Sequence, residues 1–168
     1  QLGKAALERC GRLGIEFVSA DRSELDITDK ASAEKFVEER GVDCILNCAA
    51  YTAVDAAEDN IGDAYAVNAY APHCLASLGV PLIHVSTDYV FDGRASTPYE
   101  TDSATNPLSV YGLSKRAGET ALLESGASGL IVRTAWVYSA RPAAKNFLNT
   151  MKRLASSRDE VRVVNDQK

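Results

Sequence analysis

The chain has 168 residues, 46% of them hydrophobic and 24% charged, which is enough for one domain with a substantial core. A net charge of −5 without a basic run argues against nucleic acid as a partner. No apolar stretch approaches the roughly 20 residues of a membrane span, and the four cysteines form no C-x-x-C pair. We therefore expect a cytoplasmic protein with reduced cysteines and no membrane association.

Strand-like and helix-like segments alternate along the chain. Helical periodicity and capping residues predict helices at 1–10, 29–40, 109–124 and 144–156, and a long helix within 58–78. Short apolar runs predict strands at 15–20, 42–48, 80–85, 130–134 and 161–164. Thr28 or Asp29 is expected to cap the second helix and Gly41 to end it. This alternation predicts an α/β fold, a doubly wound parallel sheet of the Rossmann-like type.

Both ends of the chain depart from that fold pattern. The chain opens directly into a helix, whereas a doubly wound nucleotide-binding fold begins with a strand and a glycine-rich turn. Gly3 would then be the last glycine of such a turn. The chain also stops just after its final strand-like segment. We expect a domain that is incomplete at both ends and lacks its first strand.

A tyrosine and a lysine four residues apart carry the clearest chemical signal. Tyr111 and Lys115 lie in the sequence Y-G-L-S-K, and on a helix this spacing places both side chains on one face. A cation beside a phenol lowers the phenol's pKa from about 10, which suits a proton donor to a carbonyl. The alternative is an amphipathic helix with a half-buried tyrosine and a solvated lysine.

The strand predicted at 80–85 favours the catalytic interpretation. It is followed by Ser86, Thr87 and Asp88, which are small polar residues at the carboxyl end of a strand. Ligands bind at that edge in open α/β sheets. His84, inside the same run, is expected to be a core histidine rather than a ligand or a base.

Polar residues also follow the strand predicted at 15–20. An acid such as Asp21 can hydrogen-bond a ribose hydroxyl of NAD, and Arg22 can accept the 2′-phosphate of NADP, so the choice of cofactor stays open. An ordinary polar turn is the alternative. Asp26 and Ile27, slightly later, are weaker candidates for contact with an adenine ring.

Two further strand ends offer candidate ligand contacts. The sequence N-C-A-A-Y-T at 47–52 contains small residues that let the backbone approach a ligand closely, although tight packing explains alanine pairs equally well. Trp136 is the only tryptophan and follows the strand predicted at 130–134. It is expected either in the core or as an amphipathic wall for a sugar or base.

Long segments of the chain resemble the extended short-chain dehydrogenase/reductase superfamily and, within it, the dTDP-4-dehydrorhamnose reductase family. They extend along nearly the whole chain in the family's order: Q-L-G at 1–3, L-D-I-T-D at 25–29, N-C-A-A-Y-T-A-V-D-A-A-E at 47–58, V-N-A at 67–69, S-T-D-Y-V-F-D-G at 86–93, N-P-L-S-V-Y-G-L-S-K at 106–115, R-T-A-W-V-Y at 133–138 and V-N-D-Q at 164–167. The number and length of these segments exclude chance agreement.

The resemblance implies NADPH- or NADH-dependent reduction of the C4 keto group of dTDP-4-dehydro-L-rhamnose to dTDP-L-rhamnose, in nucleotide-sugar biosynthesis for cell-surface polysaccharide. It implies that Tyr111 donates a proton, that Lys115 lowers the tyrosine pKa and binds the nicotinamide ribose, and that Thr87 positions the carbonyl. Asp88 and Trp136 would contact the substrate. The expected cofactor-binding residues are Gln1, Leu2, Asp21, Arg22, Asp26, Ile27, Ala50, Tyr51, Thr52, Val85, Tyr111 and Lys115.

The resemblance also implies a domain organisation. Residues 1–168 would form the NAD(P)-binding Rossmann-like domain, with a small sugar-nucleotide-binding subdomain expected beyond residue 168. Some family members use an acidic residue near the start of the first helix in a magnesium-bridged dimer, but this chain has Lys4 and Ala5 there. We therefore predict no metal, and the sequence leaves a homodimer open.

Two other functions remain as alternatives. One is another nucleotide-sugar reductase or an epimerase, although the sequence S-T-D-Y-V-F favours the reductase. The other is a non-catalytic relative, such as the regulatory β subunit of methionine adenosyltransferase. Retention of Thr87, Tyr111 and Lys115 together argues against lost catalysis.

Overall fold

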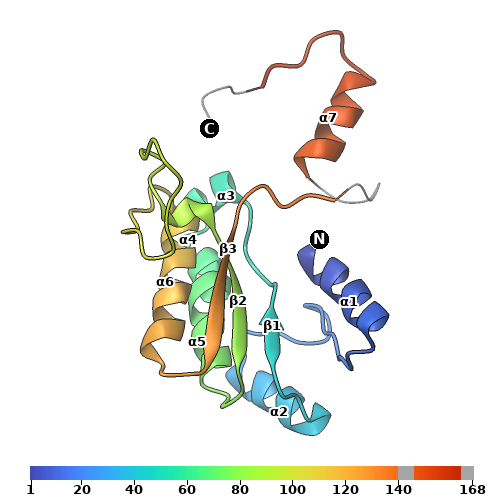
Figure 1. Ribbon diagram of the computed structural model, residues 1–168, viewed down its shortest axis with the longest axis vertical. Coiled ribbons are helices and arrows are strands. Elements are labelled where there is room, and N and C mark those ends of the chain that lie inside the picture. The colour runs from blue at the N-terminus through green and yellow to red at the C-terminus, as the bar shows by residue number, and fades with distance from the viewer. Residues whose placement is uncertain (140–145, 164–168) are drawn as a thin grey trace. The chain divides into compact units, whose positions relative to one another are not determined.

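The computed structural model describes residues 1–139 and 146–163 (Figure 1). The chain forms two compact units. One consists of Gln1–Ile15 together with the described part of Trp136–Lys168, and the other is Glu16–Ala135. The second unit contains the sheet and the residues for which chemistry is predicted.

A parallel sheet organises the second unit. Its strands are β1 (Ile45–Asn47), β2 (Leu82–Thr87) and β3 (Gly129–Thr134), and they are hydrogen-bonded in the order β1-β2-β3. Asn47 is paired with His84, and Thr87 with Thr134. The carboxyl ends of all three strands therefore lie at one edge of the sheet. This is the Rossmann-like α/β fold that the sequence predicts.

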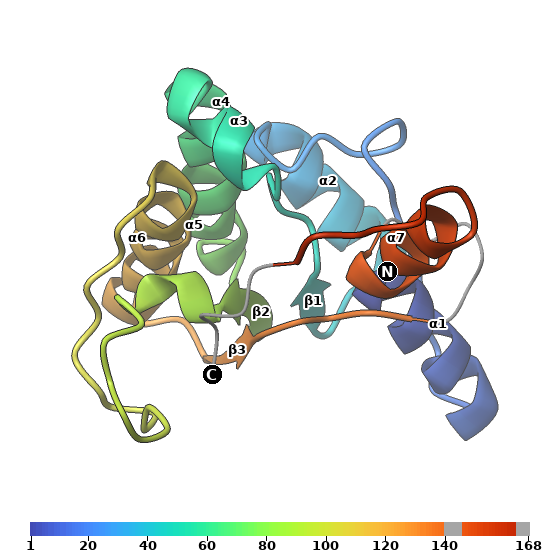
Figure 2. The same ribbon diagram turned by 90° about the horizontal axis from the view of Figure 1, so that it is seen from above.

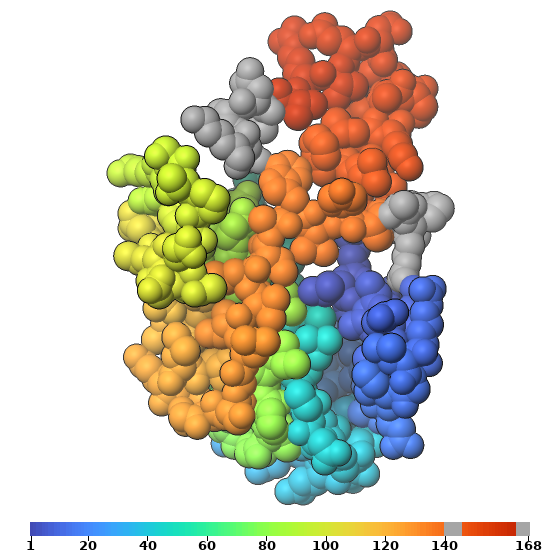
Figure 3. Space-filling view, in the orientation of Figure 1, coloured from blue at the N-terminus to red at the C-terminus, as the bar shows by residue number. Residues whose placement is uncertain are grey.

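One face of this sheet is covered by helices. α2 (Lys30–Arg40), α5 (Ala71–Ala76) and α6 (Val110–Glu124) form a layer on that side (Figure 2). The core beneath them contains Leu75, Leu82 and Leu122, whose burial stabilises the layer by roughly 1.5–3 kcal/mol per side chain. On the other face the strands themselves form the surface of this unit (Figure 3), and Leu46 and Leu130 are about half exposed.

The long helix predicted within 58–78 is confirmed in the segment from Ile61 to Ala76, which begins after a break at Asn60 and contains an irregular turn. α3 (Val54–Asp59) ends at Asn60, where φ is −121° and ψ is 51°, and the Asn60 amide donates to Ala56 O at 2.7 Å. α4 (Ile61–Tyr65) then passes into a turn of π-helix, η1 (Ala66–Tyr70), and into α5. Pro72 has no N–H, so the carbonyl of Asn68 cannot have its normal α-helical partner. The proline explains why the ladder is irregular at this point.

Two predicted strands are also wrong. Residues 15–20 form no strand, since the sheet of the described residues consists of β1, β2 and β3 alone. Ile15, Phe17 and Val18 stay about half exposed, so the segment is apolar but has no strand beside it to supply a ladder. Residues 161–163 are irregular as well, and residue 164 lies outside the described residues.

The other predicted elements are present, with shifted ends. α2 is capped by Asp29, whose carboxylate accepts from the N–H groups of Ala31 and Ser32, and it ends at Gly41 in the left-handed conformation with φ 58°. The first helix, α1, is Leu2–Leu13, and the last, α7, is Phe147–Ala155. Residues 144 and 145 of the last predicted helix lie outside the described residues. No helix in the described part of the chain is long and apolar enough to cross a membrane.

The contact between α6 and η1 yields a stability prediction. A Cβ at Gly118 would collide with the carbonyl oxygen of Asn68. Because that oxygen belongs to the backbone, Gly118→Ala is expected to lower the free energy of unfolding by about 1–3 kcal/mol. Urea unfolding of the full-length protein measures this loss. The matched control is Gly62→Ala in α4, where a Cβ meets nothing within 4 Å and alanine is the better helix former; equal losses in the two variants would contradict the packing account.

Candidate active site

The carboxyl end of β2 and the first turns of α6 bring four predicted residues together: Thr87, Asp88, Tyr111 and Lys115. Ser109 caps α6, its hydroxyl accepting from Gly112 N at 3.1 Å. At the strand end, the hydroxyl of Thr87 donates to the Asp88 carboxylate at 3.1 Å and accepts from Tyr89 N at 3.2 Å. A Cβ at Gly112 would collide with Tyr89 O, so a glycine there lets α6 approach the strand end closely.

Tyr111 is buried, with 9% of its surface exposed. Its ring packs edge-to-face on Tyr89, the centroids being 5.4 Å apart. Burial raises the pKa of Tyr111 above its ordinary value of 10.0; a hydrogen bond with Thr87 opposes this rise, and the charge of Asp88 adds to it. The expected lowering of this pKa is therefore wrong for this structure. The phenol keeps its proton at neutral pH, which a proton donor requires.

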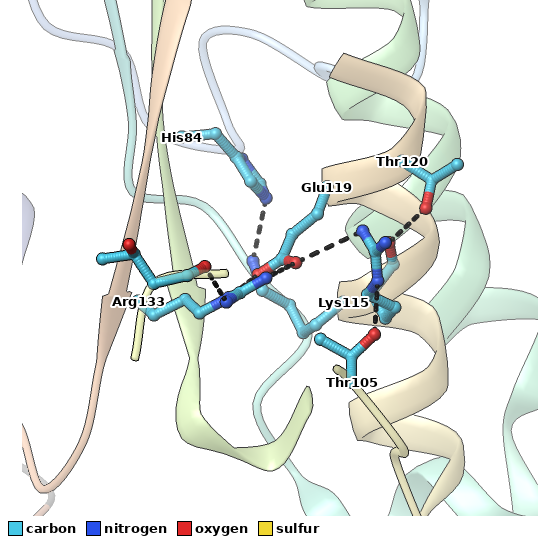
Figure 4. A network of polar contacts seen from close by, with 8 residues as sticks. His84, Thr105, Lys115, Glu119, Thr120 and Arg133 are labelled. Carbon is cyan, nitrogen blue, oxygen red and sulfur yellow. Dashed lines mark hydrogen bonds and ion pairs between the residues drawn. The ribbon is translucent and has the colours of Figure 1, made fainter. Parts of the chain in front are cut away.

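Lys115 is 1% exposed, so the alternative of a solvated lysine is wrong. Its Nζ donates to the carbonyl of Val85 at 2.7 Å and lies 3.2 Å from Nε2 of His84 (Figure 4). Burial lowers the pKa of Lys115 to about 8, and the negative charge of Glu119 opposes that shift. The amine is therefore directed at β2 by the fold.

His84 is fully buried, as expected of a core histidine. Its Nδ1 lies 3.2 Å from Nδ2 of Asn47, at the end of β1. Burial, helped by the positive charge of Lys115, lowers the pKa of His84 to about 4, and Glu119 opposes this. The imidazole is therefore neutral at physiological pH.

The sequence analysis assigned no role to Asn68, which the structure places between the two halves of the site. The side-chain amide of Asn68 pairs with the backbone of Tyr51 as a neighbouring strand would. Oδ1 accepts from Tyr51 N at 2.9 Å, and Nδ2 donates to Tyr51 O at 3.0 Å. Nδ2 also donates to the hydroxyl of Ser114 at 3.0 Å, and this hydroxyl donates to Tyr111 O at 2.8 Å. Asn68 thus ties the loop after β1 to α6. An asparagine within the apolar run A-V-N-A-Y-A-P was the available signal.

A buried carboxylate joins α6 to β3 behind the site. Arg133 makes two hydrogen bonds to Glu119, Nε to Oε1 at 2.9 Å and Nη2 to Oε2 at 2.8 Å (Figure 4). Arg116 lies 3.4 Å from the same Oε2 and also donates to Thr105 Oγ1 at 2.9 Å. Burial alone raises the pKa of Glu119, but the hydrogen bonds of Arg133 and the positive charges of Arg133 and Arg116 lower it overall. Glu119 is therefore ionised.

Two of the residues predicted to line the cofactor, Asp21 and Asp26, are ionised carboxylates that can accept hydrogen bonds. The Asp21 carboxylate accepts from Ser23 Oγ at 2.6 Å and Ser23 N at 2.8 Å, and these bonds lower its pKa. Asp26 is held in the same way by Thr28, and the charge of Arg22 lowers its pKa further. Ile27 beside them is half-buried.

The segment predicted to line the cofactor after β1 lies beside the tyrosine. Tyr51 is half-buried and packs on the apolar cluster that contains Tyr111. Ala50 is half-buried and Thr52 exposed. The backbone of this loop is therefore fixed close to the predicted proton donor.

Three predicted site residues lie in the unit formed by the two ends of the chain. The amide of Asn146 donates to Gln1 Oε1 at 2.9 Å, and Leu2 begins α1. Trp136 is 55% exposed and packs edge-to-face on Phe147. The roles of Gln1, Leu2 and Trp136 stay predictions.

The arrangement fits a nicotinamide dinucleotide. The carbonyl of Val85 accepts from only one N–H of Lys115. The amine has at least one further N–H, which can donate to a ribose hydroxyl. Asp21 offers an ionised acceptor for a second ribose. Among the described residues, no group of three or more His, Cys, Asp or Glu side chains is placed to hold a metal ion. Two shallow hollows elsewhere in the described part, one lined by Phe36 and Arg40 and one by Ser77 and Ser128, contain no predicted site residue.

A hydroxyl residue at a strand end, followed by Tyr-x-x-x-Lys on the next helix of a Rossmann-like fold, defines a domain of the short-chain dehydrogenase/reductase class. The chain belongs to the family described as the RmlD substrate binding domain, whose model matches residues 1–168.

Characterised relatives agree with this membership. A dTDP-4-dehydrorhamnose reductase of Mycobacterium tuberculosis is 46% identical over 99% of this chain, which spans 57% of that relative. Solved structures of the same enzyme from Clostridium acetobutylicum and Bacillus anthracis superpose with TM-scores of 0.93 and 0.90 at 38% and 36% identity. They cover 99% and 96% of this chain, which covers 60% and 58% of theirs, and the second is a complex with NADP.

The Glu119 ion pair predicts a pH-dependent loss of stability. Glu119→Gln removes the charge that Arg133 and Arg116 face, so we expect the free energy of unfolding at pH 7 to fall by about 3 kcal/mol. Because the folded-state pKa of Glu119 lies below its ordinary value, this contribution is complete above about pH 4.3 and disappears as the pH falls through the folded-state pKa.

Denaturant unfolding of the full-length protein at a series of pH values measures the difference. Glu124→Gln, an exposed change on the same helix, is the control and is expected to stay within about 0.5 kcal/mol of the parent. A Glu119→Gln variant as stable as the parent at pH 7 would show that the buried pair contributes nothing.

Proposed function

We propose that the protein reduces the C4 keto group of dTDP-4-dehydro-L-rhamnose to a hydroxyl with NADPH or NADH, giving dTDP-L-rhamnose. The observation that carries this proposal is the juxtaposition of Thr87, a protonated Tyr111 and a buried Lys115 at the carboxyl edge of the sheet. The names of the relatives and the NADP complex of the Bacillus anthracis protein support it. The product would serve nucleotide-sugar biosynthesis for cell-surface polysaccharide.

The chain's own residues provide positioning and a proton. The reduced nicotinamide supplies the hydride when it is bound. Tyr111 donates its phenolic proton to the oxygen that becomes negative at C4, and Thr87 hydrogen-bonds the same oxygen as charge develops. Lys115 would bind the ribose, and the tyrosinate left after the transfer would take a proton back from solvent water. Asp88 would contact the sugar nucleotide, and the same role for Trp136 rests on the resemblance alone.

The cofactor would extend along the carboxyl edge from Lys115 to the 21–27 turn. Val85 and the 50–52 loop would line its nicotinamide side, and Asp21, Arg22, Asp26 and Ile27 its adenosine side. For Gln1 and Leu2, a role at the pyrophosphate rests on the resemblance alone. In this proposal, residues 1–168 form the NAD(P)-binding domain. A sugar-nucleotide subdomain beyond residue 168 stays a prediction.

Turnover by the full-length protein tests the role of the tyrosine. Tyr111→Phe removes the proton donor and keeps the ring, so kcat is expected to fall by about 10²–10⁴-fold. Oxidation of NADPH or NADH, followed by absorbance with dTDP-4-dehydro-L-rhamnose as substrate, measures the rate.

The control is Tyr65→Phe, which removes a hydroxyl from an exposed tyrosine of α4 and is expected to keep parental turnover. A Tyr111→Phe variant with parental kcat would exclude the phenol as the donor. A parent that binds the cofactor but does not turn over this substrate would overturn the reductase assignment, in favour of a different sugar nucleotide or a non-catalytic role.

A further inference from the structure

Three buried side chains and the backbone N–H of Ala49, an exposed residue, form a continuous chain of hydrogen-bonding contacts beneath the site. Ala49 N donates to Asn47 Oδ1 at 3.0 Å, Asn47 Nδ2 lies 3.2 Å from His84 Nδ1, and His84 Nε2 lies 3.2 Å from Lys115 Nζ. Asn47, His84 and Lys115 are each 4% exposed or less. Water therefore has little access to correct a mismatched donor and acceptor in this chain.

The first contact sets the direction of all the others. A backbone N–H can only donate, so the oxygen of the Asn47 amide must face Ala49, and its NH₂ group must face His84. The NH₂ group can only donate, so Nδ1 of His84 must be the acceptor. A neutral imidazole carries one proton, which then lies on Nε2 and points at Lys115.

The last contact distinguishes the two protonation states of the lysine. An ammonium has three N–H donors and no acceptor, so it would face the Nε2–H of His84 donor against donor. A neutral amine has one lone pair, which accepts that proton, and two N–H donors. One of these donors bonds Val85 O, which lies 2.7 Å away, and the other remains for a ligand.

We propose that His84 is a positioning residue, locked by Asn47 as the Nε2–H tautomer, which donates to Lys115 and so favours the neutral amine in the folded site. The lowered pKa values of Lys115 and His84 agree with this direction.

The charged and titratable groups around Lys115 leave this assignment intact. Glu119, one turn further along α6, is the charge that favours the ammonium, but two hydrogen bonds from Arg133 on β3 engage it. On η2 (Asp88–Val90), Asp88 and Tyr89 act on Tyr111. The acids of α3 and α4 that pack near α6, namely Asp55, Glu58, Asp59 and Asp63, are exposed, and so is His73 of α5. The buried thiol of Cys74 lies on α5.

The catalytic consequence rests on the proposed function. A lysine with a pKa of about 8 is mostly an ammonium at neutral pH and becomes a neutral amine just above it, and both forms can donate a hydrogen bond to the ribose. His84 would then set the pH at which the site works, although it touches neither substrate nor cofactor.

The tautomer is tested directly by long-range ¹H–¹⁵N NMR of the full-length protein labelled in histidine and lysine, without cofactor or substrate. The His84 signal is assigned by its loss in His84→Phe. The expected result is a protonated Nε2 and an unprotonated Nδ1 at a pH above the Lys115 pKa of about 8, where the amine is neutral. A proton on Nδ1 would overturn the proposal, and because no turnover is involved, failure of the reductase assignment would leave this result unaffected.

A double-mutant cycle tests the effect on the lysine. Asn47→Asp presents acceptors to both Ala49 N and His84 Nδ1, so the histidine proton moves to Nδ1 and Nε2 can accept from the ammonium. The new charge of the aspartate raises the pKa of Lys115 by itself. Beyond that rise, the pKa, read from the ¹⁵N signal of Lys115, is expected to increase by about one further pH unit, which is the equivalent of one ordinary hydrogen bond. The same substitution in the His84→Phe background measures the charge alone. Equal rises in the two backgrounds would overturn the proposal; a dispersed amide spectrum in each variant establishes that it is folded.

Discussion

A lysine side chain buried against the backbone of β2 is the contact on which the rest of the site depends. Taking an amine out of water is costly unless it finds hydrogen-bond partners. Lys115 Nζ donates to Val85 O and lies 3.2 Å from His84 Nε2. These contacts fix the rotation of α6 relative to the strand. Tyr111, one turn earlier on the same helix, is thereby directed at the end of β2, where Thr87 lies.

The helix that carries both residues is held from its other side by irregular structure. Pro72 interrupts the ladder that η1 and α5 share, and the carbonyl of Asn68 faces Gly118 of α6 instead. The side chain of Asn68 turns the other way and bonds Tyr51 and Ser114. A local defect in one helix therefore positions both the catalytic helix and the loop after β1. Such π-turns are frequently found at functional sites.

The sequence was sufficient where local signals agreed with the tertiary structure. Three local signals predicted elements that the structure contains. They are the apolar run before Ser86, the serine that caps α6, and the boundaries of α2 at Asp29 and Gly41. It failed where partners decide the outcome. Residues 15–20 have strand composition but no neighbouring strand, and the break at Asn60 and the π-turn before Pro72 depend on hydrogen bonds that spacing does not show.

The chemistry of the site shows the same division. The Y-x-x-x-K spacing correctly placed Tyr111 and Lys115 on one helix, but it predicted the wrong direction for the tyrosine pKa. Spacing along a helix says nothing about burial, which is the largest influence on Tyr111, or about the strand carbonyl to which Lys115 turns. The contacts made by His84, Asn68 and Glu119 join residues distant in the sequence, so only the folded structure reveals them.

The most direct test of this account is the affinity of the full-length protein for NADPH, measured by calorimetry for the parent and for Lys115→Met. If the buried amine holds the cofactor's ribose, loss of that hydrogen bond should weaken binding by about tenfold or more. Lys35→Met, on the exposed face of α2, should bind as the parent does. An unchanged affinity in a folded Lys115→Met variant would contradict the claim that Lys115 links the fold to the cofactor.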